Sequence, residues 1–126
     1  MTQTDLARYP YPTAITAYGG GGFRFAEMSH RGSLLCLPSG IYAWGVDDPV
    51  SVSVETLQPV LDEAERIEIL LLGTGPTQVF ATPELRARFA ESGMSLEPMA
   101  TGAAARTYNV LLAEGRAVAA AMIAVP

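Results

Sequence analysis

Residues 67–80 read Ile-Glu-Ile-Leu-Leu-Leu-Gly-Thr-Gly-Pro-Thr-Gln-Val-Phe, and this stretch decides the fold. A continuous run of branched apolar side chains that ends in a glycine-rich turn is typical of a strand buried on both faces. Such strands lie inside sheets that helices cover, so we expect residues 67–72 to form the central strand of an α/β sheet. Gly73, Thr74 and Gly75 then stand at the carboxyl end of that strand, where open α/β sheets place their ligands.

Around this strand, helix and strand signals alternate. Ser53, Thr82 and Thr101 are N-cap residue types at helix starts, Gly115 supplies a left-handed stop, and Pro59 is unfavourable inside the first helix. The predicted elements are a helix over 53–65, the strand over 67–72, a helix over 82–93, a strand over 95–99, a helix over 103–114 and a strand over 116–123. Three helix-then-strand steps predict a mostly parallel sheet with right-handed crossovers.

The first third of the chain has the pattern of antiparallel strands. Residues 15–18 and 23–25 predict a hairpin around the glycines at 19–22, and residues 33–37 and 41–44 predict two further strands. Residues 1–12 contain two prolines and read as a loosely ordered lead-in. We therefore expect one α/β domain over residues 1–126, with antiparallel N-terminal strands before a mostly parallel sheet.

Composition restricts the possible partners and the compartment. With 49% hydrophobic and 17% charged residues the chain is not disordered, and a net charge of -5 argues against nucleic acid. The single Cys36 lies in an apolar run, so we expect a buried, inert thiol and a reducing compartment. The N-terminus does not resemble a secretory signal, and the apolar stretch 117–125 is about half as long as a membrane-spanning helix. These features predict a cytoplasmic protein without membrane insertion.

Catalytic and metal-binding sets are hard to assemble from these residues. One histidine, His30, and one cysteine cannot form a zinc site of nitrogen and sulfur ligands, and the sequence predicts no cofactor. A triad of Ser33, His30 and Asp47 or Asp48 would need distant geometry, and the alternative is a solvent-exposed histidine in a turn. The glycines at 19–22 lack the Lys-Ser/Thr pair of a phosphate-binding loop. The sequence thus favours a protein that is not an enzyme.

Two groups of residues are candidates for binding a small ligand. The backbone N–H groups of Gly73, Thr74 and Gly75 could approach an anion, although a tight turn explains the same glycines. Arg106 and Asn109 share one helix face and could grip a partner or a small anion.

A structural role competes with the binding role of that helix face. Asn109 and Thr107 could instead satisfy buried backbone groups, while Arg106 pairs with Glu97 or Glu114. On another strand, Tyr42 and Trp44 could form an exposed aromatic contact patch with Tyr18 and Phe25 nearby, or could belong to the ordinary core.

Two blocks of sequence resemble a known family. Residues 70–75 read Leu-Leu-Leu-Gly-Thr-Gly, and residues 101–116 read Thr-Gly-Ala-Ala-Ala-Arg-Thr-Tyr-Asn-Val-Leu-Leu-Ala-Glu-Gly-Arg. Over nearly the whole chain, from about residue 12 to 125, the sequence resembles the domain-of-unknown-function family that includes mitochondrial complex I assembly factor 3. The resemblance implies a three-layer α/β fold whose central mixed sheet has an antiparallel last strand. It also implies no established enzymatic activity and a role that works through a protein partner.

The chain departs from the family pattern at two positions of the second block. The family reads Asp-Thr-x-x-Ala-Cys-x-Thr-Tyr/Phe-Asn there, whereas this chain has Ala100 in place of the Asp and Ala105 in place of the Cys. Alanine has no group that ionises or attacks, so no thiol chemistry is available at that position. The positions that match are Thr101, Ala104, Thr107, Tyr108, Asn109, Leu112, Glu114 and Arg116.

Three hypotheses for function follow from the sequence. The leading one is a soluble, non-enzymatic protein-interaction domain that helps assemble a larger, respiratory-type complex, with self-association into a homodimer as a further possibility. The second is a small-molecule or anion-binding protein, or a weak enzyme, that uses the edge at Gly73 to Gly75 with Arg106, Asn109 and Arg116. The third is a structural remnant without a ligand.

Overall fold

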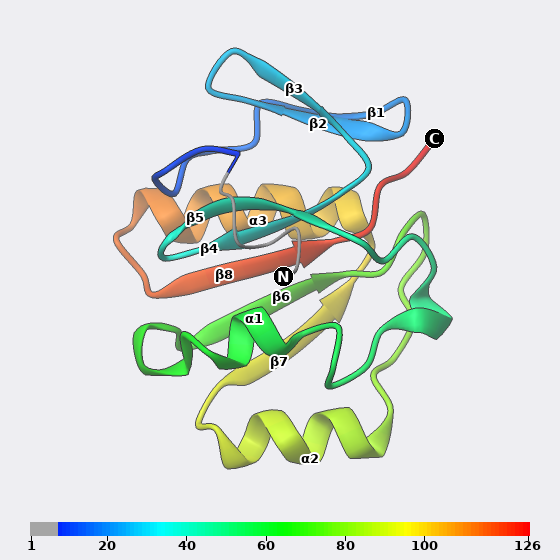
Figure 1. The fold of residues 1–126 in the computed structure, drawn as a ribbon, viewed down its shortest axis with the longest axis vertical. Coiled ribbons are helices and arrows are strands. Elements are labelled where there is room, and N and C mark those ends of the chain that lie inside the picture. Colours follow the sequence, from blue (N-terminus) through cyan, green and yellow to red (C-terminus); the bar gives the residue numbers. More distant parts are fainter. Residues whose placement is uncertain (1–7) are drawn as a thin grey trace.

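A computed structural model describes residues 8–126, which form two β-sheets and three α-helices (Figure 1). The first sheet is antiparallel with the order β1-β2-β3, and the second has the order β5-β4-β8-β6-β7. The strands are β1 (Ala17–Gly19), β2 (Gly22–Phe25), β3 (Met28–Arg31), β4 (Ser33–Leu37), β5 (Gly40–Trp44), β6 (Ile69–Gly73), β7 (Ser95–Met99) and β8 (Val118–Met122). The helices are α1 (Gln58–Leu61), α2 (Pro83–Glu91) and α3 (Thr101–Ala113), with 3₁₀ turns η2 (Pro49–Ser51) and η3 (Ala64–Arg66).

The five-stranded sheet combines parallel and antiparallel pairs. Strand β6 is parallel to both β7 and β8, while β4 is antiparallel to both β5 and β8. The predicted mixed α/β sheet is therefore confirmed. The last strand, β8, is antiparallel to β4 but parallel to β6. It also occupies the middle of the sheet, a position that the sequence pattern had predicted for β6.

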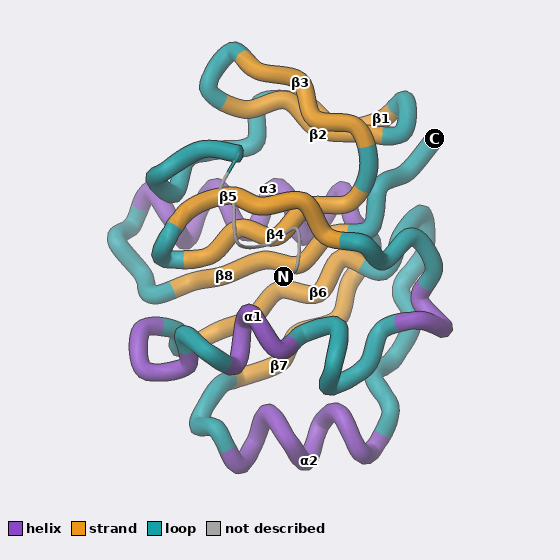
Figure 2. The backbone as a smooth tube through the Cα atoms, viewed as in Figure 1, coloured by secondary structure: helices purple, strands orange, loops and turns teal. Residues whose placement is uncertain are grey.

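Both faces of this sheet are covered, which gives the molecule three layers (Figure 2). Leu70 and Leu72 of β6 pack against α1 and α2 in one core cluster. Leu71 points to the other face and packs with α3 and β2 in a second cluster. An uninterrupted run of leucines fits this position because neither face of β6 meets water.

Local signals predicted two of the three helices well. The Oγ1 of Thr82 accepts a hydrogen bond from Leu85 N at 3.2 Å, which is the expected N-cap of α2. Gly93 and Gly115 have φ values of +83° and +75°, as left-handed stops require. Helix α3 begins earlier than predicted, with Ala100 at the N-cap position, so Thr101 is not its cap.

The helix predicted over residues 53–65 is wrong. The segment forms only the single turn of α1 and the 3₁₀ turn η3. Pro59 stands in the first turn of α1, where its missing N–H costs nothing, so the helix begins there and not at Ser53. Ser53 Oγ accepts a hydrogen bond from Thr56 N at 3.2 Å inside a local turn.

The N-terminal strands include one that the sequence pattern did not predict. The β1–β2 hairpin turns at Gly20 and Gly21 with φ values of +59° and +85°, as expected for a two-residue turn. Strand β3 follows β2 through a second two-residue turn. Its tip residues Ala26 and Glu27 have φ values of 49° and 62°, although neither is a glycine. Of the predicted lead-in, residues 1–7 lie outside the described part, and Tyr9 forms an antiparallel bridge with Ile41.

Replacing Glu27 by glycine is expected to stabilise the protein by about 1 kcal/mol, because a side chain in the left-handed region costs about 1–2 kcal/mol. The urea midpoint of unfolding, at constant slope, measures this gain. Glu27→Ala is the matched control, since it removes the charge but keeps the unfavourable backbone conformation. A gain of equal size in Glu27→Ala would show that the charge, and not the backbone, causes the effect.

Candidate functional site

The turn at Gly73, Thr74 and Gly75 lies between the carboxyl end of β6 and the first turn of α3. Thr74 N donates to Met99 O at 2.9 Å, and Gly75 N donates to Thr101 Oγ1 at 3.0 Å. The backbone N–H groups of Thr74 and Gly75, two of the three that would hold an anion at this edge, are therefore already bonded within the protein. Gly75 has a φ of +101°, which explains the glycine as a requirement of the turn.

Thr101 connects three elements at this edge. Its side chain is fully buried, and its hydroxyl donates to Ile123 O at 2.7 Å while it accepts from Gly75 N. Thr101 N also donates to Gly75 O at 2.8 Å. The threonine that the sequence pattern assigned to a helix cap thus joins β6, α3 and the end of β8.

Thr74 shapes the loop that follows β6. Its hydroxyl donates to Thr77 O at 2.7 Å and accepts from Val79 N at 2.9 Å. These bonds fold the loop so that Val79 and Phe80 face outward, with exposed fractions of 41% and 75%. The buried Thr74 side chain thus sets the shape of this turn, while the apolar side chains of the loop remain outside.

Next to this loop lies the 3₁₀ turn η2, which carries the half-buried Pro49 and the exposed Val50. Pro49 of η2 lines a cavity of about 30 Å³ together with Val79 and Phe80, and the neighbouring Val50 is 91% exposed. We call the residues Pro49, Val50, Val79 and Phe80 the apolar rim. On its other side, Phe80 also lines a groove of about 420 Å³ between α2 and β7. That groove is lined by Gln78, Phe80, Ala81, Arg86, Phe89, Ala90, Met94, Leu96, Glu97 and Pro98.

The edge strand β7 beside this groove is closed to further strand pairing at one end. Pro98 has no backbone N–H, and its carbonyl oxygen accepts a hydrogen bond from Gln78 Nε2 at 2.9 Å. A partner that binds beside Pro98 must therefore contact side chains, because the backbone at Pro98 has no free group for pairing with another strand.

The polar residues predicted on α3 do not gather at the Gly73–Gly75 edge. Asn109 Oδ1 accepts a hydrogen bond from Ile15 N and its Nδ2 donates one to Ile15 O, both at 2.8 Å. Asn109 thus satisfies backbone groups, which is the structural role that the sequence offered as the alternative to ligand binding. Arg106 Nη1 donates to the Tyr18 hydroxyl at 3.1 Å, so neither predicted glutamate partner is used. Thr107 is half-buried on the same helix.

Arg116 lies at the other end of the sheet. It precedes β8 and pairs with Glu68, which precedes β6, at 3.5 Å. Because β6 and β8 are parallel, both residues stand at the amino ends of these strands, away from Gly75. The predicted polar pocket that would combine Arg116 with Arg106 and the glycine turn is therefore not formed.

Of the two alternatives for Trp44, an exposed contact patch or the ordinary core, the structure shows the core. Its side chain is only 5% exposed, packs in the core cluster beneath α1, and donates from Nε1 to Thr56 O at 2.8 Å. The alternation of residue types along the short strand β5 did not predict which of its two faces the rest of the protein covers.

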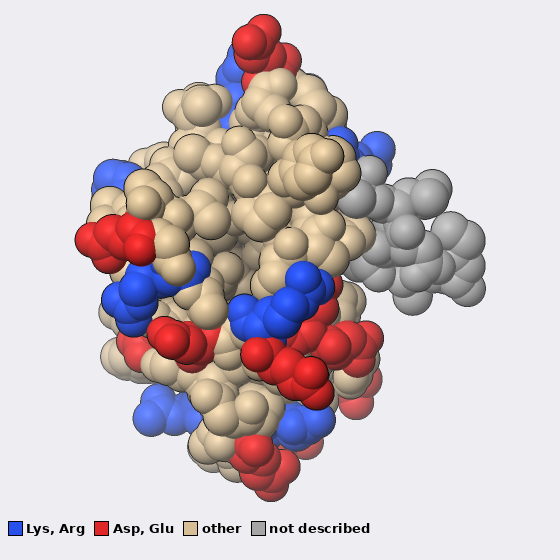
Figure 3. Space-filling model, turned by 90° about the vertical axis from the view of Figure 1, so that its left-hand side faces the viewer, with Lys and Arg blue, Asp and Glu red and all other residues tan. Residues whose placement is uncertain are grey.

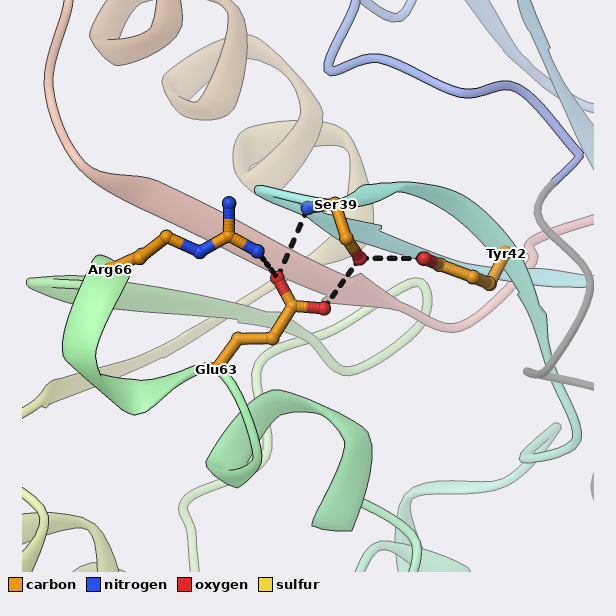
Figure 4. Close-up of polar contacts among 4 residues, drawn as sticks. All are labelled: Ser39, Tyr42, Glu63 and Arg66. Atoms are coloured by element: carbon orange, nitrogen blue, oxygen red, sulfur yellow. Dashed lines mark hydrogen bonds and ion pairs between the residues drawn. The ribbon is translucent and has the colours of Figure 1, made fainter.

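Tyr42 takes part in a polar network and not in an open patch (Figure 4). Its hydroxyl lies 2.6 Å from Ser39 Oγ, and Ser39 N donates to Glu63 Oε1 at 3.0 Å. Glu63 also pairs with Arg66 at 3.0 Å. The network ties the β4–β5 turn to the segment between α1 and η3, so it holds the fold together.

The triad considered from the sequence is absent from the described residues. The His30 ring is buried and its Nε2 donates to the backbone oxygen of Ser33 at 3.0 Å, whereas Ser33 Oγ accepts from Ala124 N. Asp48 caps η2 by accepting from Val50 N at 2.9 Å. Burial lowers the pKa of His30, so the ring is neutral at pH 7. The expectation of an exposed turn histidine is therefore wrong.

Two further ionisable side chains lie in the core. Cys36 is buried, and burial raises the pKa of its thiol to about 12, as expected for an inert cysteine. Burial also raises the pKa of Tyr108, whose hydroxyl lies beside the Cys36 thiol and has no other hydrogen-bond partner among residues 8–126. Within that same part of the chain, no three His, Cys, Asp or Glu side chains are placed to hold a metal ion.

Charged side chains are unevenly distributed over the surface. One face carries acidic and basic groups side by side across its lower half, below a broad area without charge (Figure 3). None of the helices within residues 8–126 has both the length and the apolar character that crossing a membrane requires.

These features define a mixed α/β domain with an exposed apolar rim and, among the described residues, no assembled catalytic set. The chain belongs to the family described as "Protein of unknown function (DUF498/DUF598)", whose model matches residues 15–123. The family predicted from the two sequence blocks is thereby confirmed.

Three relatives illustrate the range of this family. An uncharacterised protein of Rhodobacter capsulatus is 38% identical over 89% of this chain and 85% of its own length. The zebrafish (Danio rerio) NADH dehydrogenase [ubiquinone] 1 alpha subcomplex assembly factor 3 is 32% identical over 90% of this chain and 66% of its own length. The crystal structure of an outer membrane protein from Bartonella henselae is 50% identical, with a TM-score of 0.91 over 94% of this chain and all of that one.

Proposed function

We propose that this chain is a protein-interaction domain that helps to assemble a larger, respiratory-type complex, and that the apolar rim is its contact surface. The name of the zebrafish relative, an assembly factor for a subcomplex of NADH dehydrogenase, supports the assembly role. The observation that carries the proposal is the joint exposure of Val50 and Phe80 on neighbouring segments. Exposed apolar side chains that gather on one part of a surface are typical of sites that another protein covers.

Phe80 has the position of an anchor residue. It stands between the small cavity towards η2 and the groove along α2, so a partner that covers it would contact both hollows. Aromatic side chains at the centre of an interface commonly contribute 2 kcal/mol or more, about thirtyfold in affinity. The flanking Pro49, Val50 and Val79 would exclude water around it.

The occupant that fits this surface is an apolar segment of a partner subunit that docks through side chains. Pro98 and its bond to Gln78 disfavour pairing of a partner strand with that part of β7. The groove beside Phe80 is apolar at its base, with Phe89, Met94 and Leu96, and carries Arg86 and Glu97 among its lining residues. An amphipathic helix with apolar side chains on one face matches such a groove.

Replacing Phe80 and Val50 together by serine is expected to weaken partner capture at least thirtyfold while leaving the fold intact, because both side chains are exposed. The measurement is native mass spectrometry of the gently purified, tagged protein from its own cells. Val110→Ser is the matched control, since Val110 is 56% exposed on α3, away from the rim. Retention of a stoichiometric partner by the double variant, or its equal loss in the control, would refute the rim as the contact surface.

We propose two further properties of the protein. The first is self-association into a homodimer through the same apolar rim, and the second is a location in the cytoplasm. Sedimentation of the wild type and of the Phe80 and Val50 double variant tests the first point, because a homodimer through the rim would dissociate in the variant. Cell fractionation tests the second, since the Bartonella henselae relative is called an outer membrane protein. Recovery with the membrane fraction after a high-salt wash would contradict the cytoplasmic placement.

A further inference from the structure

The charges of this chain are divided between its two parts. Residues 8–46 carry three arginines and one carboxylate, whereas residues 47–126 carry five arginines and eleven carboxylates. The N-terminal three-stranded sheet therefore forms a basic region on an acidic protein. The basic side chains of this region are Arg24 and Arg31 within the sheet and Arg8, which precedes it, and the single carboxylate, Glu27, is at the β2–β3 turn.

The strand register places two of these arginines on one face. Arg24 of β2 pairs with Ser29 of β3, and Gly22 pairs with Arg31. Because side chains alternate along a strand, Arg24, Ser29, Gly22 and Arg31 all point to the same side, opposite to the buried Phe23 and Phe25. Arg24 and Arg31 are thus diagonal neighbours, within reach of a single small ligand.

The surface between the two arginines is hollowed because its other residues are small. A cavity of about 470 Å³ is lined by Arg24, Ser29 and Arg31 and by the glycines of the β1–β2 turn. Any side chain at Gly22 would collide with the backbone of His30, so this floor has no room for a Cβ. The guanidinium of Arg31 lies beside Gly21, with Nη1 at 3.8 Å from where a Cβ would stand.

A second hollow lies on the other side of β3. It measures about 270 Å³ and is lined by Arg8 together with Ser29, His30 and Arg31. Arg31 and Ser29 therefore line both hollows, and three guanidinium groups surround one edge strand.

Arg8, Arg24 and Arg31 have no ion-pair partner within residues 8–126. The arginines that do form ion pairs in this part of the chain are Arg66 and Arg116. Three neighbouring positive charges repel one another, and a bound anion would relieve that repulsion. Among residues 8–126, neither of the two ion pairs involves Arg8, Arg24 or Arg31, so their charges are available to an external anion.

We propose that the Arg24, Ser29 and Arg31 face binds a phosphate group, with Arg8 adding positive charge from the other side of β3. Two guanidinium forks can each donate two parallel N–H···O bonds to phosphate oxygens, and the Ser29 hydroxyl can donate a further one. The hollow admits a free phosphorylated molecule and, being open to solvent, also the headgroup of a phospholipid. The proposal is independent of the apolar rim.

The test is a titration of the ¹⁵N-labelled full chain with inorganic pyrophosphate, followed by amide chemical shifts. We expect shifts confined to residues 17–31, and binding about tenfold weaker in Arg24→Gln and in Arg31→Gln. Arg86→Gln is the charge-matched control on α2 and is expected to bind like the wild type. All these arginines are solvent-accessible, so unchanged unfolding midpoints check that the variants are folded.

A second arm separates the two sources of phosphate. Vesicles of phosphatidylcholine with phosphatidic acid are sedimented with the protein, and vesicles of phosphatidylcholine alone serve as the blank. Binding to either probe that is lost in the Arg24→Gln, Arg31→Gln double variant supports the site and identifies its source of phosphate. No binding to either probe at millimolar concentration, or equal weakening by Arg86→Gln, would overturn the proposal.

Discussion

Truncation of Tyr108 to alanine is expected to lower the free energy of unfolding by about 3–5 kcal/mol, the cost of removing a large aromatic side chain from a packed core. Tyr108 is fully buried in the cluster that α3 forms with β2 and β4. Its hydroxyl is also buried, with no hydrogen-bond partner among residues 8–126 besides the weak one that the Cys36 thiol offers. Tyr108→Phe is therefore expected to change stability by less than about 1 kcal/mol, because only the weak contact with the Cys36 thiol is lost.

Urea unfolding of the two variants measures this difference, and Cys36 provides an independent readout. The thiol lies in the same core and has a pKa of about 12, so it should react with alkylating reagents only when the core opens. Tyr108→Ala should accelerate labelling at neutral pH, whereas Tyr108→Phe should not. If phenylalanine costs as much as alanine, the hydroxyl has a stabilising partner and the explanation fails.

Replacement of Thr101 by valine is expected to cost about 2–5 kcal/mol, although the two side chains have nearly the same shape. Without the hydroxyl, the N–H of Gly75 and the carbonyl of Ile123 would each lose a buried hydrogen bond. A buried polar group left without a partner costs about 1–3 kcal/mol. Thermal or urea unfolding measures the loss.

Thr101→Ser is the control for this prediction. It retains the hydroxyl and removes only a methyl group, so a loss of about 1 kcal/mol is expected. Amide hydrogen exchange locates the effect, because Gly75 N–H should become less protected in the valine variant than in the serine variant. Equal losses in both variants would assign the effect to packing and not to the hydrogen bonds.

Much of the fold could be predicted from local patterns. The leucine run of β6, the Thr82 cap of α2 and the glycines of the β1–β2 turn are signals that a few neighbouring residues carry by themselves. The helix over 53–65 failed because apolar spacing suggested helix while Pro59 fixed a later start. Strand β3 was missed because Met-Ser-His-Arg shows no apolar alternation, and its stability comes from pairing with β2.

The candidate site was less predictable because it depends on distant partners. The position of the Gly73–Gly75 turn was predicted, but the use of its N–H groups depends on Thr101, which is 26 residues from Gly75. Asn109 bonds Ile15, 94 residues away, and no local pattern indicates this pair. The apolar rim likewise joins η2 to the loop after β6, and exposure of Val50 and Phe80 becomes visible only in the folded molecule.

The central position of β8 affects how the chain can fold during synthesis. Strands β4 and β5 form one hairpin, and β6 and β7 form a parallel pair, yet the two halves meet only through β8. Until residues 118–122 have left the ribosome, each half exposes an unpaired strand edge of leucines. Such edges are prone to wrong pairing between chains, so a nascent chain stalled before Val118 should depend on chaperones that the completed chain no longer needs.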